Sequence, residues 1–239
     1  MSTHQNKFCE IQKAIIECRK CPRLVEWREK VARERVRRFQ NEEYWGRPLP
    51  AFGAEDASLI VIGLAPAAHG GNRTGRMFTG DSSGDWLYEA MARYGFANQP
   101  HATHRNDGLH LFDCLITAAV RCAPPQNKPL PDEMENCRTY LRAELQLLKS
   151  KRVVVALGQI GFKAFLKAWL ENGGLLPSPK PVFKHGGEWV LPGGLVLIAS
   201  YHPSRQNTQT GKLTRSMLQA VFRKARHILN REEPSCRDI

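Results

Sequence analysis

No stretch of this chain is apolar for long enough to cross a membrane. A membrane-spanning helix needs about 18 or more consecutive apolar residues, and the 239 residues contain no such run. Residues 1–17 also lack the short apolar core of a secretory signal. We therefore expect a cytoplasmic protein with no membrane partner.

Repeats and acidic residues are also scarce. The chain has no internal repeat and no low-complexity tract, which argues against a solenoid or a fibrous protein. The 23 Asp and Glu are outnumbered by 35 Lys and Arg, so the net charge is +12 and the isoelectric point is about 9.6. Such a charge favours a nucleic-acid partner, although any polyanion would satisfy the same field.

Seven cysteines are present, and four of them form two small groups. Cys18 and Cys21 lie in a CxxCP segment, and Cys122 and Cys137 follow about a hundred residues later. Clustered cysteines in a reducing compartment bind metals more often than they form disulfides. The spacing predicts a four-thiolate cage for an iron–sulfur cluster or for zinc.

Four short runs rich in Val, Ile, Leu and Ala predict strands that are buried on both faces. They cover residues 58–63, 114–120, 152–158 and 195–201. Helical patterns lie between them at residues 85–94, 132–149 and 159–172, with Asp132 as an expected N-cap and a final helix at about 213–230. This alternation predicts a parallel sheet with helices on both faces.

The N-terminal region reads as helical and basic. Residues 10–21 predict a short amphipathic helix that ends at Pro22. Residues 23–38 are dense in Arg, Lys and Glu, which fits either a solvated charged face or a surface that contacts phosphates.

The loops after the strands carry the candidate site, because ligands of open parallel sheets bind at the carboxyl ends of the strands. Residues 63–81 read GLAPAAHGGNRTGRMFTGD, which fits neither common glycine-rich nucleotide-binding pattern. Arg73 and Arg76 are candidate phosphate contacts, and Phe78 offers a face on which a base can stack. Asp81 could orient a water molecule, or it could cap the next helix.

Two further loops carry polar residues. Residues 199–205 read ASYHPSR, which places His202 at a strand end as a hydrogen-bond donor, a general acid or a structural residue. The polar loop that follows is suited to a DNA groove, with Ser204, Arg205 and Gln206 as candidate contacts. In RCAPPQNKP, residues 121–129, Asn127 could bond a base edge or organise a turn.

Together these three segments resemble the type-b, or family 5, uracil-DNA glycosylases, which are iron–sulfur relatives of the family 4 enzymes. The resemblance runs from about Cys18 to Leu218. It implies an α/β fold, a three-layer α/β/α sandwich around a four-stranded parallel sheet, in one monomeric domain over residues 1–239. The region at about 8–45 would hold the cofactor, and the tail after residue 232 would be disordered. The implied cofactor is a [4Fe–4S] cluster on Cys18, Cys21, Cys122 and Cys137, with zinc as the alternative.

The resemblance also implies an activity, namely hydrolytic excision of uracil and of other deaminated bases from DNA, with hypoxanthine and xanthine as candidates. The nucleotide must first be flipped out of the stack. Phe78 would stack on the base, the main chain of Gly63, Leu64 and Ala65 would line its pocket, and His202 would bond a base oxygen.

This chain departs from the sister families at two points. Their first loop carries an acidic or amide residue that this chain lacks, so Asp81 is the candidate for positioning water. Family 4 enzymes also carry an asparagine where this chain has Thr117-Ala118-Ala119-Val120, which predicts a permissive pocket. The competing interpretation is a non-catalytic, metal-stabilised module that binds nucleic acid.

Overall fold

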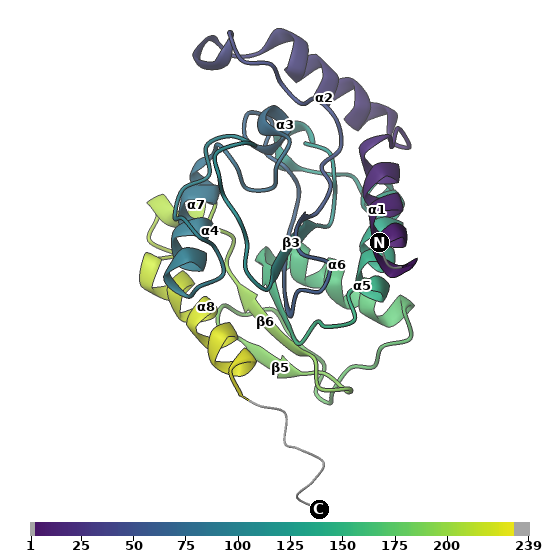
Figure 1. Cartoon of the computed structure of the whole chain (residues 1–239), viewed down its shortest axis with the longest axis vertical. Coiled ribbons are helices and arrows are strands. Elements are labelled where there is room, and N and C mark those ends of the chain that lie inside the picture. Colours follow the sequence, from purple (N-terminus) through teal and green to yellow (C-terminus); the bar gives the residue numbers. More distant parts are fainter. Residues whose placement is uncertain (1–2, 232–239) are drawn as a thin grey trace, which may run out of the picture.

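A computed structural model describes residues 3–231 of the chain, and it is built around one six-stranded sheet (Figure 1). The strand order is β1-β3-β2-β4-β6-β5. The four inner strands are parallel to one another, and the two edge strands run antiparallel to their neighbours. The bounds are β1 Phe52–Gly53, β2 Leu59–Gly63, β3 Cys114–Ala118, β4 Val153–Leu157, β5 Glu188–Val190 and β6 Val196–Ser200.

The four predicted strands form the centre of the sheet. All five residues of each inner strand are buried, as expected for strands covered on both faces. The short edge strands β1 and β5 are additions that the sequence patterns do not predict. In β5, two of three residues are exposed, so no apolar run marks it.

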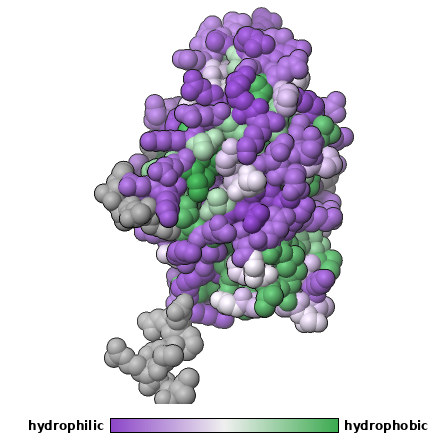
Figure 2. Space-filling view, turned by 90° about the vertical axis from the view of Figure 1, so that its right-hand side faces the viewer, coloured by the Kyte–Doolittle hydropathy of each residue, from purple (hydrophilic) through white to green (hydrophobic). Residues whose placement is uncertain are grey.

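Helices cover both faces of the sheet and complete the predicted three layers. The helices α4 Ser82–Arg93 and α8 Arg215–Leu229 pack on one face and on each other. The helices α5 Pro131–Leu147 and α6 Gly158–Glu171 cover the other face, and α1 Thr3–Ile16 packs on α5. From the side that carries α1 and α6, the outer surface is mainly hydrophilic (Figure 2).

The remaining elements are short or lie outside the layers. They are α2 Pro22–Glu34, η1 Arg37–Phe39, α3 Gly71–Thr74, η2 Pro125–Asn127 and α7 Arg205–Gln209. The helix predicted at 10–21 starts earlier and ends at Ile16. The expected N-cap Asp132 is wrong, because Leu130 occupies that position and the Glu133 side chain accepts a bond from its N–H at 2.7 Å.

Two expectations stay predictions. The tail after residue 232 lies outside the described residues, and so its expected disorder is not tested. A single domain over residues 1–239 is not tested either. Within residues 3–231, no helix is long and apolar enough to span a membrane.

Candidate active site

Two of the predicted loops meet at the carboxyl edge of the sheet. The loop after β2 brings Phe78, and the end of β6 leads to His202, so that the two rings lie with centroids 5.8 Å apart and tilted by 31°. A second contact joins the same two segments, because Nε of Arg205 donates to Oγ of Ser82 at 3.4 Å. The sequence therefore brings an aromatic face and an imidazole together at the edge where ligands bind such sheets.

The backbone around Phe78 is unusual. Its φ is 51°, a left-handed conformation that is uncommon for a bulky residue and marks functional sites when the surroundings enforce it. Gly84 in α4 permits it, since a Cβ there would overlap the carbonyl oxygen of Phe78. The Phe78 ring lies across the end of β2, because a Cβ on Gly63 would come within 2.8 Å of the ring.

His202 is held by the segment that follows it. Its carbonyl accepts a bond from Nδ2 of Asn207 at 2.8 Å. The side chain keeps some accessible surface but is densely surrounded, and this burial lowers its pKa to about 4. The imidazole is therefore neutral near pH 7, with one ring N–H available as a donor.

Asp81 caps α4. Its Oδ1 accepts bonds from the N–H groups of Ser83 at 2.9 Å and Gly84 at 3.0 Å, so the capping role is present. Its Oδ2 lies against Gly70, where a Cβ would clash with it. Burial raises the pKa of Asp81, although the two backbone bonds and Arg205 act in the opposite direction. One oxygen thus serves the helix, and the part that Asp81 plays towards water stays a prediction.

Arg73 and Arg76 both lie buried with internal partners, and their contact with DNA stays a prediction. Arg73 is 6% exposed, pairs with Glu42 and donates to the carbonyl of Gly80. Arg76 is 5% exposed and binds Asp107 at 2.7 Å. The internal partners of both guanidinium groups hold the loop in place.

The expected DNA loop after His202 is helical. Ser204 is the N-cap of α7, accepting from the N–H of Asn207 at 3.4 Å, and this serine after a strand is the signal by which the helix could have been predicted. Arg205 and Gln206 lie exposed in its first turn. Their contact with DNA stays a prediction.

The predicted base-binding main chain is fixed by pairing beyond the strands. The carbonyls of Gly63 and Leu64 accept from Ala119 at 3.0 Å and Val120 at 2.9 Å, and Ala65 follows with partial exposure. Asn127 is exposed and left-handed, with φ 57°, and its N–H closes a turn onto Pro124 at 3.1 Å. The roles of these residues towards a base stay predictions.

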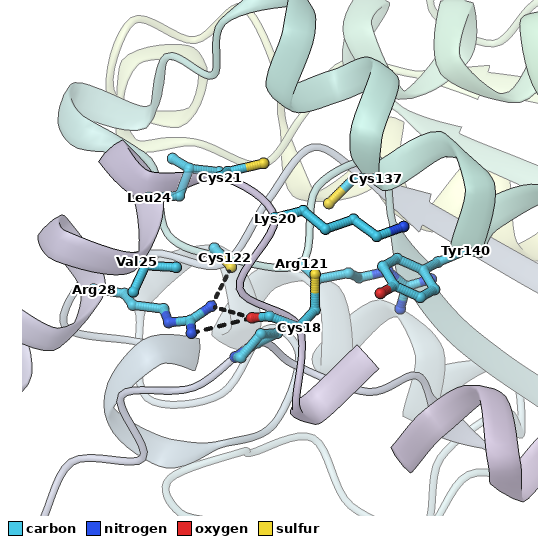
Figure 3. Close-up of a pocket in the computed structure, with 11 residues that line it drawn as sticks. Cys18, Lys20, Cys21, Leu24, Val25, Arg28, Arg121, Cys122, Cys137 and Tyr140 are labelled. Atoms are coloured by element: carbon cyan, nitrogen blue, oxygen red, sulfur yellow. Dashed lines mark hydrogen bonds between the residues drawn. The ribbon is translucent and has the colours of Figure 1, made fainter. Parts of the chain in front are cut away.

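The four cysteines predicted to form a cage line one pocket (Figure 3). Cys18 and Cys21 come from the link between α1 and α2, Cys122 from the loop after β3, and Cys137 from α5. All four carry free thiols, and we refer to them as the thiol cage. Three of them are buried, with Leu24 and Val120 packed among them.

Two arginines face the thiol cage and fit an anionic occupant. Arg28 is 2% exposed and donates to Sγ of Cys122 at 2.8 Å and to the carbonyl of Cys18 at 3.2 Å. Nε of Arg28 and both Nε and Nη1 of Arg121 are buried without a partner among the described residues. Buried donors of this kind carry a free-energy cost unless a ligand satisfies them. Arg28 escaped prediction because it stands among the charged residues of 23–38.

Within residues 3–231, no three or more His, Cys, Asp or Glu side chains are grouped as they would be around a bound metal ion. The choice between an iron–sulfur cluster and zinc therefore stays a prediction.

A buried polar network connects the thiol cage to β3. Arg121 and Glu144, which are 1% and 0% exposed, form an ion pair, and Oγ1 of Thr117 donates to Glu144 at 2.7 Å. Nε2 of Gln12 in α1 donates to the other carboxylate oxygen at 2.9 Å. Glu144 thus joins α1, β3 and the cage loop, a role that its position in a helical pattern does not indicate.

Comparisons with known proteins agree with this geometry. The model of the uracil DNA glycosylase superfamily matches residues 50–226. A type-5 uracil-DNA glycosylase of Thermus thermophilus is 51% identical over 211 residues, covering 88% of this chain and 93% of the relative. Type-5 enzymes of Mycobacterium bovis and Pyrobaculum aerophilum are 47% and 46% identical, covering 92% and 88% of this chain and 81% and 88% of their own lengths. The chain therefore belongs to the uracil DNA glycosylase superfamily, within its type-5 group.

Proposed function

We propose that this protein is a monofunctional DNA glycosylase that removes uracil, together with other deaminated bases such as hypoxanthine and xanthine, and so starts base excision repair. The observation that carries the proposal is the pairing of Phe78 with a neutral His202 over the end of β2. Similarity to type-5 uracil-DNA glycosylases over most of the chain supports the same reaction.

The target base must leave the helix before it can reach this site. The glycosidic bond is inaccessible inside the stack, so the nucleotide is flipped out at a cost of a few kcal/mol. The Phe78 ring then offers a flat apolar surface, and base–aromatic stacking is worth about 1–3 kcal/mol per base. The strained backbone at Phe78 holds the ring in place before the base arrives.

His202 acts by donating a hydrogen bond to the leaving base. As the N-glycosidic bond breaks, its electron pair moves to the base, and negative charge develops on a base oxygen. A neutral, fixed imidazole N–H stabilises that charge without first losing a water shell. Removing such a donor typically costs about 100- to 1000-fold in rate.

Asp81, three residues after Phe78 in the same loop, supplies the candidate carboxylate. A water oxygen bonds to the sugar carbon on the side opposite the departing base, and its proton must be accepted. Oδ1 of Asp81 is engaged by the helix, so Oδ2 is the atom that would orient this water. Gly70 leaves room for that oxygen, because any side chain there would collide with it.

The pocket is proposed to be permissive because β3 offers no base-reading amide. Thr117 turns its hydroxyl to the buried Glu144, and Ala118 and Ala119 follow it. A site that lacks such a base-reading side chain discriminates more weakly between related ligands. Single-turnover excision from duplexes that each carry uracil, hypoxanthine or xanthine should give rates within about 100-fold of one another. A preference for uracil of about 10,000-fold or more would contradict a permissive pocket.

The decisive experiment separates catalysis from capping at Asp81. In Asp81→Asn the side-chain oxygen still caps α4, so thermal stability should be kept while uracil excision falls at least about 100-fold. Asp85→Asn, the same change at an exposed carboxylate in the first turn of α4, is the matched control. Full activity in Asp81→Asn would leave this residue as a helix cap only. Binding of DNA with no release of any base by the wild-type protein would favour a non-catalytic binding module.

We also propose that the thiol cage holds a [4Fe–4S] cluster with a structural role. Bound there, the cluster would tie the α1–α2 link to the loop after β3 and to α5. Cys122→Ser should lose iron and acid-labile sulfide together, whereas Cys9→Ser, at an exposed cysteine of α1, should keep both. Stoichiometric zinc without sulfide in the wild-type protein would assign the cage to zinc instead.

A further inference from the structure

Trp45 forms an outer wall of the loop after β2. Its N–H donates to the carbonyl of Arg73 at 2.9 Å, and its indole Nε1 donates to the carbonyl of Pro48 at 3.1 Å. The ring lies directly on Gly75, where a Cβ would meet it at 3.0 Å. The indole is therefore fixed on the same loop that presents Phe78 and Asp81.

Two exposed arginines gather around this ring. The guanidinium of Arg105 lies 4.6 Å from the ring centroid, and that of Arg47 lies 5.8 Å away. We name Trp45, Arg47 and Arg105 the Trp45 patch. Among the ion pairs of residues 3–231, none involves Arg47 or Arg105. An indole orders a guanidinium without neutralising its charge, so both charges remain available to an anion.

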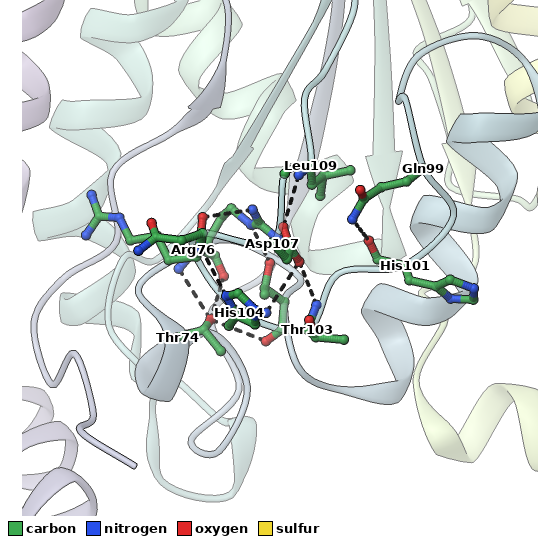
Figure 4. A network of polar contacts seen from close by, with 12 residues as sticks. Thr74, Arg76, Gln99, His101, Thr103, His104, Asp107 and Leu109 are labelled. Carbon is green, nitrogen blue, oxygen red and sulfur yellow. Dashed lines mark hydrogen bonds and ion pairs between the residues drawn. The ribbon is translucent and has the colours of Figure 1, made fainter.

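The loop that carries Arg105 is held by several hydrogen bonds. Asp107 accepts from Arg76 at 2.7 Å and from the N–H groups of Thr103 at 2.8 Å and Leu109 at 3.0 Å (Figure 4). Burial alone would raise the pKa of Asp107, but these bonds hold it at about 2, so the carboxylate stays charged at any ordinary pH. Arg76 donates to the carbonyl of Arg105 at 3.2 Å as well.

The same loop is tied to the candidate active site. The N–H of Gly80, the residue before Asp81, donates to the carbonyl of Ala102 at 2.8 Å. The buried Arg76 thus helps to position the exposed Arg105 beside the site. The Trp45 patch adjoins α3, because the backbone N–H of Trp45 donates to the carbonyl of Arg73 in that helix.

We propose that the Trp45 patch docks the sugar–phosphate backbone of DNA on one side of the flipped nucleotide. This inference rests on the proposed function, and it places a phosphate-binding surface apart from the α7 segment. Arginine is suited to phosphate through its planar, forked donors. Two of the positive charges behind the net charge of +12 are then held in fixed positions near the proposed base pocket.

The test is a double variant, Arg47→Gln/Arg105→Gln, with binding measured on a duplex that carries an abasic-site analogue. Removing one arginine–phosphate interaction makes the plot of log K against log salt shallower by about 0.9, so removing two should make it shallower by about 1.8. Affinity near physiological salt should drop at least about tenfold. With enzyme in saturating excess, the excision rate should fall far less than the affinity does.

The control is Arg93→Gln/Lys149→Gln, which removes the same charge from exposed side chains at the amino ends of the strands. Equal losses in the two double variants would overturn the proposal, because net charge alone would explain them. Unchanged binding by the first variant would overturn it too. If the wild-type protein binds the duplex but excises nothing, the proposed function fails. The comparison of the two double variants then still decides whether the Trp45 patch binds DNA.

Discussion

Protonation of His202 offers a measurable test of how the site is built. Burial lowers the pKa of His202 from 6.5 to about 4. Above pH 6.5, the imidazole is neutral in both the folded and the unfolded chain, and it contributes nothing to pH dependence. Below pH 6.5, His202 is protonated in the unfolded chain but stays neutral in the folded protein. Stability is therefore lost as the pH falls from 6.5 to 4.

The magnitude follows from the two pKa values. The free energy of unfolding falls by about 3 kcal/mol below pH 4 because of His202 alone. At pH 5 the loss is already about 2 kcal/mol. Urea unfolding of the wild type and of His202→Asn at pH 7 and pH 5 measures it, because other titrating groups cancel in the comparison. The wild type should lose about 2 kcal/mol more than the variant between these two pH values. His110→Asn, at an exposed histidine, controls for loss of a surface imidazole. An equal loss in wild type and His202→Asn would refute a buried, neutral His202.

Two further predictions concern packing and charge. Gly84→Ala should destabilise the fold by about 1–3 kcal/mol, although alanine normally favours a helix, because the new Cβ would displace Phe78. The excision rate should fall together with stability. Asp85→Ala, at the exposed neighbouring position, should change neither stability nor excision. A more stable Gly84→Ala protein would contradict the close approach of Gly84 to the carbonyl of Phe78. Glu144→Gln should cost about 3–5 kcal/mol in urea unfolding, since it leaves buried Arg121 without its carboxylate. Glu171→Gln, which breaks the more exposed pairs with Arg138 and Arg142, should cost about 1 kcal/mol or less, and similar losses in the two variants would mean that burial of Arg121 is unimportant.

The centre of the fold could be predicted because the burial of its strands is visible in their amino-acid composition. A strand covered on both faces must be apolar throughout, and the four predicted runs contain the four inner strands within one or two residues at each end. The edge strand β5 gives no such signal, since Glu188 and Val190 face solvent. Helix starts were less predictable, because Leu130 caps α5 through backbone geometry rather than through its side chain.

The residue types of the site could be predicted from the sequence. Whether its charged side chains point to solvent or to the interior could not. Phe78 and His202 follow strands that end at the same edge, so sequence and topology together bring them into contact. Whether Arg76 points out to DNA or inward depends on Asp107, which lies 31 residues away. Nothing local in the glycine-rich segment encodes that partner. The exposed arginines were missed for the converse reason, since Arg47 and Arg105 become neighbours only through Trp45.

Arg28 joins two parts of the protein that are distant in sequence. Its guanidinium contacts Cys122, and its carbonyl accepts a bond from Nδ2 of the fully buried Asn72 at 3.2 Å. Asn72 lies in the segment that leads to Phe78 and Asp81. The loop that carries Phe78 and Asp81 is therefore anchored by α2, the helix that carries Arg28. With the proposed cluster in the cage, its assembly and the shaping of this loop would be one step, so that iron supply would limit how much of the newly made protein reaches the proposed active form.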